Sequence, residues 1–405
     1  MISQPGLKWR DDVFFGPQPY WTVEPCLKTI ERLARRHLNV IEGHPCEVAY
    51  FNNGAFNKVY TIVTQRESFM MRVSLPVDLH FKVLSEVATI NFIIAYDVSY
   101  ENELGFEWVL TELIPGKRLD EQWTSMSWEA KEILIKQLVD FSAQLFCKQY
   151  SATGNLYNLE SIKSRKQRLY KSALRTLVLR IVVHRIVSIQ FFPGDRVNQE
   201  VSRGPFLSSR DWLAAQLRFI TNDAENVLRE LTEENSIKDA EAKKMLAERL
   251  FKQLPEVFAD PGISEPTALV HDDLGEANIL VDDAGALTAV LDWEFVSVVP
   301  LWRVCQLPYL FKGATREESL VKEEYAHDEQ GEVNECYWDY RVFFEEIERV
   351  EPEWVRIHKS STMKENFYIA VNDTAIGMFS IRTTKWLDQL EAGGEVESIQ
   401  ADMHG

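Results

Sequence analysis

The stretch LVHDDLGEANILVDD, residues 269–283, places acidic and amide side chains at a spacing that suits catalysis. Within it, His271-x-Asp273-x-x-x-x-Asn278 is followed by Asp292 further along the chain. Phosphoryl transfer uses such a set: one carboxylate orients the acceptor hydroxyl and takes its proton, while an amide oxygen and a second carboxylate hold magnesium. Asp273 is therefore the candidate catalytic base, and Asn278 and Asp292 are the candidate metal ligands.

The same spacing also fits an ordinary acidic turn between two strands, because aspartate and asparagine favour such turns. The sequence context favours an enzyme loop over this alternative. The apolar runs ALV and NILV bracket the loop, DDAG closes a hairpin, and the returning strand ALTAVLDWE ends at Asp292. Such a hairpin would bring Asn278 and Asp292 together although they are distant in sequence.

A strand-rich region precedes this loop and is a candidate nucleotide holder. Three β-branched or aromatic runs predict antiparallel strands, namely EVAYF (47–51), KVYTIVT (58–64) and FMMRVS (69–74). Between the first two runs, Asn52, Asn53 and Gly54 tolerate positive φ, so their N–H groups could turn toward phosphate oxygens. An ordinary hairpin turn at these residues is the alternative.

A cation for the phosphates would come from the third strand. Kinase-type sites place a lysine there and pair it with a glutamate of the next helix. This chain has Arg72 in the strand and Glu86 in a helix predicted over 79–94. Arginine binds phosphate bidentately but is not a simple replacement for lysine, and a surface ion pair is the alternative. By analogy, the connector TELI offers backbone groups at Glu112 and Ile114 to an adenine edge.

Hydrophobic periodicity predicts the remaining elements and an α+β fold. Helices are expected over 25–38, 127–150 and 241–257 and from Ser208 onward, with a further strand at 106–114 and helix and loop after about 300. This pattern predicts a small β-rich lobe and a larger, mainly helical lobe, with the ligand in the cleft between them. The expected division is an N-terminal helical extension (1–45), the nucleotide-binding N-lobe (46–114), the catalytic and substrate-binding C-lobe (115–390) and a flexible tail (391–405).

The composition excludes several classes of protein. The 405 residues are 45% hydrophobic, which allows a core of two lobes, and the net charge of −18 argues against nucleic-acid binding. Five cysteines without a C-x-x-C pair favour a reducing compartment. No apolar run reaches the ~18 residues of a membrane span, and the first residues match no targeting segment. We therefore expect a cytoplasmic protein without a membrane partner, whose oligomeric state the sequence does not indicate.

The motifs together resemble the aminoglycoside phosphotransferase-like (choline kinase-type) enzymes, especially their fungal group, within the protein-kinase-like superfamily. The matching pieces span about residues 46–312 and are GAFNKVY, RVSLP, SEVATI, NELGFEWVLTELIPG, RGPFLSSRDWL, HDDLGEANILVDD, LDWEFVSVVPLW and CQLPYLF. The resemblance implies a bilobal protein-kinase-like fold. It also implies transfer of the γ-phosphoryl group of ATP, with Mg²⁺, to a hydroxyl of a small molecule.

The resemblance carries over to individual positions of this chain. Asp273 matches the catalytic base, and Asn278 and Asp292 match the metal ligands. Arg72 and Glu86 match the phosphate-side ion pair. Gly54 belongs to the phosphate loop, and His271 would buttress the catalytic loop.

Three departures from the family pattern concern the site. Asp272 stands where bacterial members usually have glycine, and Arg72 stands where lysine is usual. The segment TINFIIAYDVSYENELG, residues 89–105, is about a dozen residues shorter than in relatives. A real deletion or a gene-model error would each explain the short segment. Either would be expected to remove part of the small-lobe sheet.

Other functions stay open at this point. A pseudokinase-like nucleotide-binding or scaffold protein is the main alternative, favoured by Arg72 and the short segment and disfavoured by the complete acidic set. A protein kinase is disfavoured because no D-F-G or A-P-E motif follows the loop. The basic stretch 162–185 is either a solvated helix face or part of the acceptor region. The acceptor itself cannot be identified from the sequence.

Overall fold

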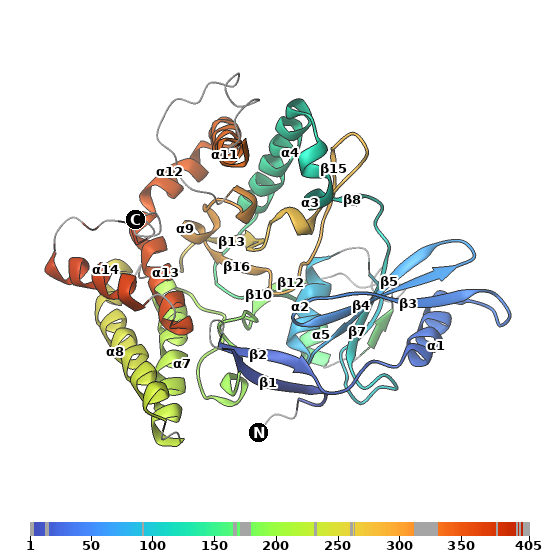
Figure 1. Cartoon of the computed structure of the whole chain (residues 1–405), viewed down its shortest axis with the longest axis horizontal. Helices are drawn as coiled ribbons and strands as arrows, with labels where there is room; N and C mark the ends of the chain where they lie inside the picture. The colour runs from blue at the N-terminus through green and yellow to red at the C-terminus, as the bar shows by residue number, and fades with distance from the viewer. Residues whose placement is uncertain are drawn as a thin grey trace.

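The computed structural model shows two lobes, with the strands of the smaller lobe on one side and most helices on the other (Figure 1). The structure describes residues 4–12, 16–90, 93–164, 168–170, 180–230, 233–259, 262, 264–311, 331–377, 380–393, 396 and 398–399. The α+β class expected from the sequence is confirmed.

The small lobe is built on a six-stranded sheet in the order β11-β6-β7-β5-β4-β3. Every neighbouring pair in this sheet is antiparallel. Its strands are β3 (Cys46–Asn53), β4 (Asn57–Thr64), β5 (Ser68–Ser74), β6 (Ile93–Asp97), β7 (Glu107–Glu112) and β11 (Arg168–Tyr170). The three strands predicted between residues 47 and 74 are present as β3, β4 and β5.

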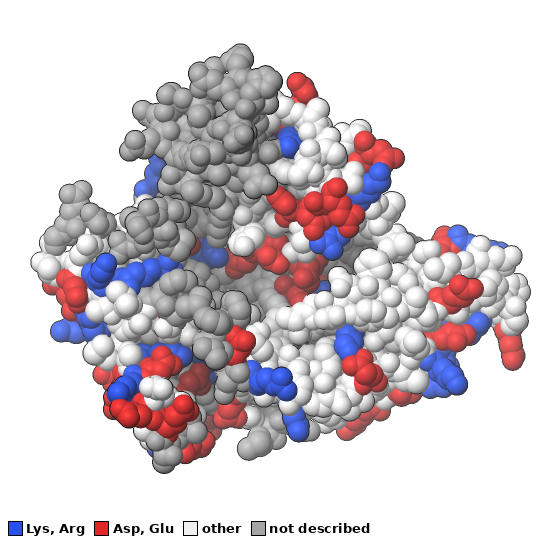
Figure 2. Space-filling view, viewed as in Figure 1, with Lys and Arg blue, Asp and Glu red and all other residues white. Residues whose placement is uncertain are grey.

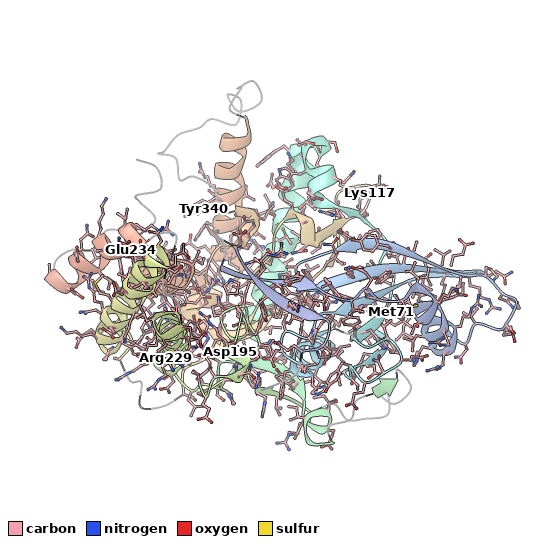
Figure 3. All side chains as sticks on the ribbon, turned by 60° about the horizontal axis from the view of Figure 1, so that its bottom comes forward. Met71, Lys117, Asp195, Arg229, Glu234 and Tyr340 are labelled. Atoms are coloured by element: carbon pink, nitrogen blue, oxygen red, sulfur yellow. The ribbon has the colours of Figure 1, made fainter. Side chains whose placement is uncertain are left out.

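Helices cover both faces of this sheet because side chains alternate along each strand. On one face, Ile30 of α1 (Leu27–Leu38) belongs to a buried cluster with Met71 and Leu110, and Figure 3 shows Met71 within the sheet. On the other face, Val83 of α2 (Phe81–Thr89) clusters with Val109, the neighbour of Leu110. The sheet is therefore the shared core of the small lobe, and α2 lies on one fixed face of it.

The helix predicted over 79–94 is shorter than expected. α2 ends at Thr89, and Ile93–Asp97 forms the strand β6. The expected loss of part of the sheet at this short segment is thus wrong. β6 pairs with β7 and buries Ala95 and Tyr96 on opposite faces of the sheet, which outweighs continued helical periodicity.

The segment before the small lobe contains more than a helix. α1 matches the helix predicted over 25–38, but a hairpin of β1 (Leu7–Asp12) and β2 (Gly16–Trp21) precedes it and was not predicted. Figure 1 shows this hairpin between the two lobes. Leu7 shares a buried cluster with Leu75 of the small lobe and Phe192 of the large lobe. The hairpin therefore packs against both lobes.

The large lobe is a helical body built around a large buried core. Its α-helices are α3 (Leu119–Gln122), α4 (Trp128–Cys147), α5 (Leu159–Ser164), α7 (Ser209–Glu230), α8 (Glu234–Val257), α9 (Leu301–Val304), α11 (Gly331–Val350), α12 (Pro352–Ser360), α13 (Thr362–Ile376) and α14 (Ser380–Ala392). Its short 3-10 helices are η1 (Trp123–Ser125), η2 (Arg196–Asn198), η3 (Glu276–Asn278) and η4 (Tyr309–Phe311).

Two helix starts and one helical hairpin illustrate how the sequence produces these elements. Ser127 accepts a hydrogen bond from the Ala130 N–H and so caps α4, as Ser208 does for α7 through Asp211. α7 and α8 pack against each other, and Figure 3 labels Arg229 near the end of α7 and Glu234 at the start of α8. The tail expected from residue 391 lies mostly outside the described residues.

Short strands in the large lobe carry the candidate catalytic loop. They are β8 (Lys117–Arg118), β9 (Gln149–Tyr150), β10 (Asn155–Asn158), β12 (Ile181–His184), β13 (Thr267–Val270), β14 (Ile279–Val281), β15 (Leu287–Val290) and β16 (Ser297–Pro300). β14 pairs with β15 on one side and with β8 on the other. Because β8 directly follows the connector from the small lobe, the same small sheet ties the loop to the hinge between the lobes.

Two further observations concern membrane-spanning helices and the cysteines. Among the described helices, none combines the length and the apolar character needed to cross a membrane. Cys26, Cys46, Cys147 and Cys305 are free thiols.

Candidate active site

Asp273 and Asn278 lie together in the loop that follows β13. The Asn278 side-chain amide donates to the Asp273 backbone carbonyl at 2.9 Å and to its carboxylate Oδ2 at 2.8 Å. Asp273 is exposed toward solvent. Asn278 therefore orients the Asp273 carboxylate through its nitrogen, and its Oδ1 oxygen is a separate acceptor on the same amide group.

Asp292 joins this pair from the returning strand. Ile279 pairs with Val290 across the hairpin, and the Leu291 N–H donates to the Asn278 carbonyl at 2.7 Å. This register brings Asp292 to the loop, as the sequence predicted. Asp292 has a φ of 57°, a conformation that residues other than glycine adopt only when their surroundings enforce it.

The Asp292 carboxylate lies among other charges. Burial raises its pKa to about 6, and Glu294 and Asp273 act in the same direction, whereas Arg72 and Lys82 oppose the shift. Because 40% of the side chain remains exposed, solvent screens part of these interactions. The like charges of Asp292 and Asp273 favour a cation between them.

Arg72 connects the two lobes. From β5 its guanidinium forms an ion pair with Glu86 of α2, and Nη1 donates to Asp292 Oδ1 at 3.2 Å. Arg72 and Glu86 therefore form the pair that the sequence predicted. The surface-pair alternative is wrong, because the Glu86 side chain is only 4% exposed. The contact with Asp292 was not predicted.

A second buried cation, Lys82, lies one helical turn before Glu86. Its Nζ is 2.9 Å from Glu294 Oε2 and donates to Asn57 Oδ1 at 2.7 Å. The Asn57 amide donates to the same Glu294 oxygen at 2.7 Å. Burial by itself would raise the pKa of Glu294, but the charges of Lys82 and Arg72 hold this pKa below its usual range. The two lobes are thus joined by a second charged network, which is almost entirely buried.

His271 and Asp272 hold the loop in place. The His271 imidazole Nε2 lies 2.8 Å from the Leu291 carbonyl, so Nε2 carries the proton, and burial lowers the pKa of His271. Asp272, which had no predicted role, binds Arg303 at 2.7 Å. Burial opposes the charge of Arg303, but Asp272 and Glu365 hold its pKa above the usual range. The His271 contact is consistent with the supporting role expected for this residue, and the Asp272 contact supports the same loop.

The candidate phosphate loop differs from the expectation. Asn52 and Asn53 end β3, and neither they nor Gly54 has a positive φ. Gly54 donates to the Asn57 carbonyl at 3.0 Å, and a Cβ added to it would meet nothing within 4 Å. The turn therefore does not need glycine for its own fold, because the hairpin closes without a left-handed residue. Phe56, two residues on, contacts Phe295 with ring centroids 5.1 Å apart.

Glu112 and Ile114 lie where the small lobe leads into the large one. Glu112 is the last residue of β7, opposite Phe69 of β5. The Leu113 N–H between them donates to the Ser68 carbonyl at 3.2 Å. Their contact with an adenine edge stays a prediction.

Half of the basic stretch 162–185 lies outside the described residues. Its final residue, Arg185, binds the buried carboxylate of Asp78 at 2.6 Å and lies 4.5 Å from the Phe81 ring centroid. This end of the stretch therefore packs against the small lobe.

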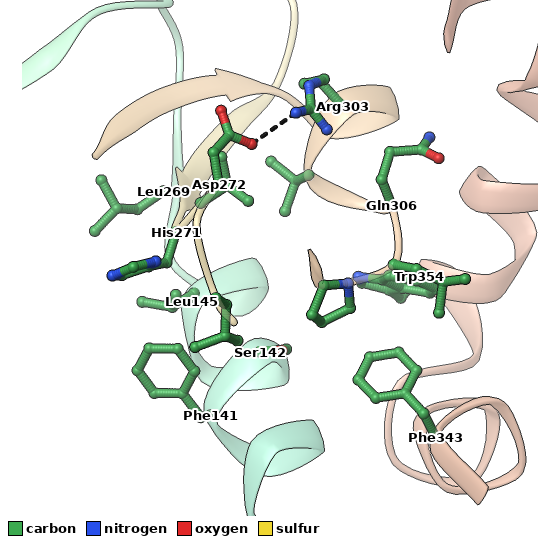
Figure 4. A pocket seen from close by; sticks show the side chains of 15 residues that line it. Phe141, Ser142, Leu145, Leu269, His271, Asp272, Arg303, Gln306, Phe343 and Trp354 are labelled. Atoms are coloured by element: carbon green, nitrogen blue, oxygen red, sulfur yellow. Dashed lines mark hydrogen bonds and ion pairs between the residues drawn. The ribbon is translucent and has the colours of Figure 1, made fainter. Parts of the chain in front are cut away.

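A cavity of about 40 Å³ lies beside the catalytic loop (Figure 4). Asp272 and Arg303 border it on one side, and Phe141, Phe343 and Trp354 border it on others. This volume admits a few water molecules at most, so it is too small for a nucleotide or an acceptor. Figure 2 shows a hollow between the lobes, with acidic side chains gathered in and around it.

The sequence missed Lys82, Asn57 and Glu294 as site residues. Lys82 lies four positions before Glu86, and Glu294 lies two after Asp292, so both flank predicted positions. The i, i+4 spacing of Lys82 and Glu86 was the available signal, because it places both on one face of a helix.

Comparison with known proteins identifies the family. The model of the phosphotransferase enzyme family matches residues 48–303. The chain belongs to this family. Residues 48–303 contain every predicted site residue, from Gly54 to Asp292.

Curated relatives match parts of the chain. A subtelomeric hrmA-associated cluster protein of Aspergillus fumigatus is 24% identical over 306 residues, which cover 63% of this chain and 58% of that protein. The altered inheritance of mitochondria protein 9 of Eremothecium gossypii is 27% identical over 149 residues, 31% of this chain and 24% of that protein. The clavilactone A biosynthesis cluster protein Y of Ampulloclitocybe clavipes is 66% identical over 32 residues, 8% of each chain. The chain thus spans little more than half the length of the first of these relatives.

Solved structures with a similar arrangement include two aminoglycoside phosphotransferases. A putative one from Ralstonia eutropha is 13% identical, with 93% of each chain covered and a TM-score of 0.42. APH(4)-Ia, in a ternary complex with AMP-PNP and hygromycin B, is 13% identical, with 90% of this chain and 92% of that chain covered and a TM-score of 0.43.

Proposed function

We propose that this protein is a magnesium- and ATP-dependent phosphotransferase that moves the γ-phosphoryl group to a hydroxyl of a small molecule. The observation that carries this proposal is the contact between Arg72 and Asp292, which joins the two lobes beside the Asp273–Asn278 pair. Membership of the phosphotransferase enzyme family supports it. The nucleotide would lie between the N-lobe, residues 46–114, and the C-lobe, residues 115–390.

The residues present fit a magnesium ion. Asp292 offers its carboxylate, whose Oδ1 atom is contacted by Arg72. Asn278 offers its side-chain oxygen Oδ1, since its side-chain nitrogen already donates to Asp273. Hard oxygen ligands of this kind suit Mg²⁺, which takes the rest of its shell from water and phosphates. Consistent with so few protein ligands, the described residues contain no group of three or more His, Cys, Asp or Glu that would hold a metal alone. When bound, magnesium neutralises charge on the transferring phosphates.

The chain's own residues supply positioning and one proton acceptor. Asp273 would orient the acceptor hydroxyl and accept its proton while the hydroxyl oxygen bonds to the γ-phosphorus and the bond to the β–γ bridging oxygen breaks, releasing ADP. Asn278 holds the Asp273 carboxylate ready for this role. Arg72, fixed by Glu86, would contact the phosphates, and Gly54, Glu112 and Ile114 would contact the nucleotide through their backbone.

Thermal unfolding with AMP-PNP, with and without magnesium, tests this proposal. A ligand at a hundred times its Kd adds about 2.7 kcal/mol of stability, which is a shift of a few degrees in Tm. We expect a magnesium-dependent shift in the wild type that Asp292→Ala loses. Asp283→Ala is the matched control, since Asp283 lies in the same hairpin and its ion pair is with the exposed Lys117, at 2.9 Å.

Phosphate transfer from ATP to a panel of hydroxyl compounds then separates an enzyme from a nucleotide-binding scaffold. Asp273→Asn should keep the magnesium-dependent shift and abolish transfer. A shift without transfer to any acceptor would favour the scaffold, and a wild type without a shift at millimolar AMP-PNP would refute the proposal.

A further inference from the structure

Lys82 is a buried cation whose partners belong to both lobes. Its side chain is 0% exposed, and Nζ contacts Glu294 Oε2 at 2.9 Å and Asn57 Oδ1 at 2.7 Å. Ser74 Oγ also donates to Asn57 Oδ1, at 2.9 Å. Glu294 is only 10% exposed. A lysine and a glutamate buried this deeply keep their charges through each other, through nearby charges such as Arg72, and through their hydrogen bonds, so the geometry of the network is tightly constrained.

Glu294 lies within a segment of unusual backbone conformation. Asp292 has a φ of 57° and Phe295 has a φ of 60°, so left-handed residues bracket Trp293 and Glu294. Non-glycine residues in this region cost free energy and persist only where the surrounding contacts hold them. The segment 292–295 therefore depends on its side-chain contacts for its shape.

Each residue of this segment has such a contact. The Trp293 indole N–H donates to the Val290 carbonyl at 2.8 Å. The Phe295 ring packs against Phe56 and Phe192, with centroids 5.1 Å from each. The pair of Lys82 and Glu294 differs from these contacts because it is both charged and buried. Breaking it would leave a carboxylate without its cation inside the protein.

Two ion pairs lead from one face of α2 toward the same aspartate. Lys82 and Glu86 are four residues apart and so lie on the same side of the helix. Glu86 holds Arg72, which contacts Asp292 directly. Lys82 holds Glu294, two residues beyond Asp292. The position of Asp292 is thus tied to α2 through two ion pairs.

We propose that Lys82 is a positioning residue of the magnesium site: through Glu294 it holds segment 292–295 so that Asp292 faces the metal. This inference rests on the proposed phosphotransferase function. Residues that orient metal ligands without touching the metal typically change metal affinity 10–100-fold when they are replaced. We therefore expect Lys82→Met to weaken the apparent magnesium affinity of the AMP-PNP complex by about ten-fold or more, and to leave metal-free AMP-PNP binding within about two-fold of the wild type.

The ligand-free protein offers a readout that does not depend on the metal. Hydrogen exchange of peptides covering residues 291–297 should be faster in Lys82→Met than in the wild type, beyond any change in the rest of the chain. Lys131→Met is the control, because Lys131 is also a buried lysine but lies on α4 in the large lobe, 4.7 Å from the Trp123 ring centroid. It should alter neither the exchange of 291–297 nor the magnesium affinity.

A second variant separates positioning from simple charge balance. Lys82→Met with Glu294→Gln removes both charges, so stability lost in the single variant should largely return. If Lys82 positions the segment, magnesium affinity stays weak in the double variant. Recovery of magnesium affinity together with stability would overturn the inference, as would unchanged exchange of 291–297 in Lys82→Met. Wild-type protein without any magnesium-dependent shift would instead refute the proposed function, and this inference with it.

Discussion

Glu107 should make the stability of the small lobe depend on pH. Its side chain is 1% exposed at the start of β7, and its carboxylate accepts the His80 N–H at 2.7 Å, just before α2. Burial raises the pKa of Glu107 to about 8, Asp78 and Asp97 raise it further, and Lys82 and the His80 hydrogen bond oppose the shift. The folded protein therefore keeps a proton on Glu107 that an unfolded chain releases.

The sign and size of the effect follow from this difference. The stabilisation by Glu107 is fully present below its usual pKa of 4.5 and is lost as the pH rises toward about 8. At about 1.4 kcal/mol for each pH unit over which only the unfolded chain is ionised, the loss between pH 5 and pH 8 is about 3–4 kcal/mol. Glu107→Gln removes the titrating group and keeps an oxygen to accept from the His80 N–H.

Urea unfolding of the wild type and Glu107→Gln at four values from pH 5 to pH 8 measures this effect. The stability of the variant relative to the wild type should rise by about 3–4 kcal/mol across that range. Glu103→Gln is the control. Burial raises the pKa of Glu103, but the hydrogen bond and charges of Arg32 and Arg36 hold it below its usual range, so Glu103 is largely ionised in both the folded and the unfolded chain from pH 5 to pH 8. The difference between Glu103→Gln and the wild type should therefore stay nearly constant over this range. A difference for Glu107→Gln that stays constant within about 1 kcal/mol would refute the reasoning.

Two further predictions concern the loops of the site. Gly54→Ala should change stability by less than about 0.5 kcal/mol, because the added Cβ meets nothing within 4 Å, yet it should weaken AMP-PNP binding in the same thermal assay. Unchanged binding would remove Gly54 from the phosphate site. Asp272→Asn should cost about 1–2 kcal/mol in urea unfolding, since it removes the carboxylate nearest to Arg303 and leaves Glu365 at 3.9 Å. The 52% exposure of Asp272 keeps the loss below that of a fully buried pair. A loss no larger than that of Asp283→Asn would show that Arg303 does not need this partner.

Arg72 combines two tasks in this arrangement. A lysine offers one compact charge, whereas the arginine fork reaches Glu86 with one nitrogen and Asp292 with another. The departure from the usual lysine therefore adds a contact between the lobes to the ion pair within the small lobe.

The hairpin around the catalytic loop could be predicted because its signals are local. Apolar runs on both sides of a short polar segment, closed by DDAG, indicate two paired strands, and strand pairing then places Asp292 near Asn278. The pair of Arg72 and Glu86 followed from one strand and the next helix. The same local reasoning extended α2 too far, because the periodicity near Ile93 suits a helix and only pairing with β7 makes it a strand.

Tertiary structure alone decided the burial and the partners of the remaining site residues. From its sequence context, Lys82 would be expected to be a surface lysine near the start of a helix, yet its side chain is 0% exposed between the packed lobes. Asn57 and Glu294, its partners, are 237 positions apart, so no local pattern relates them. Amino-acid type and spacing determined which groups the chain carries at the proposed site. Tertiary structure decided which of these groups are buried together and so stabilise one another's charges. Their burial depends on contacts between distant segments that form only when the two lobes pack against each other.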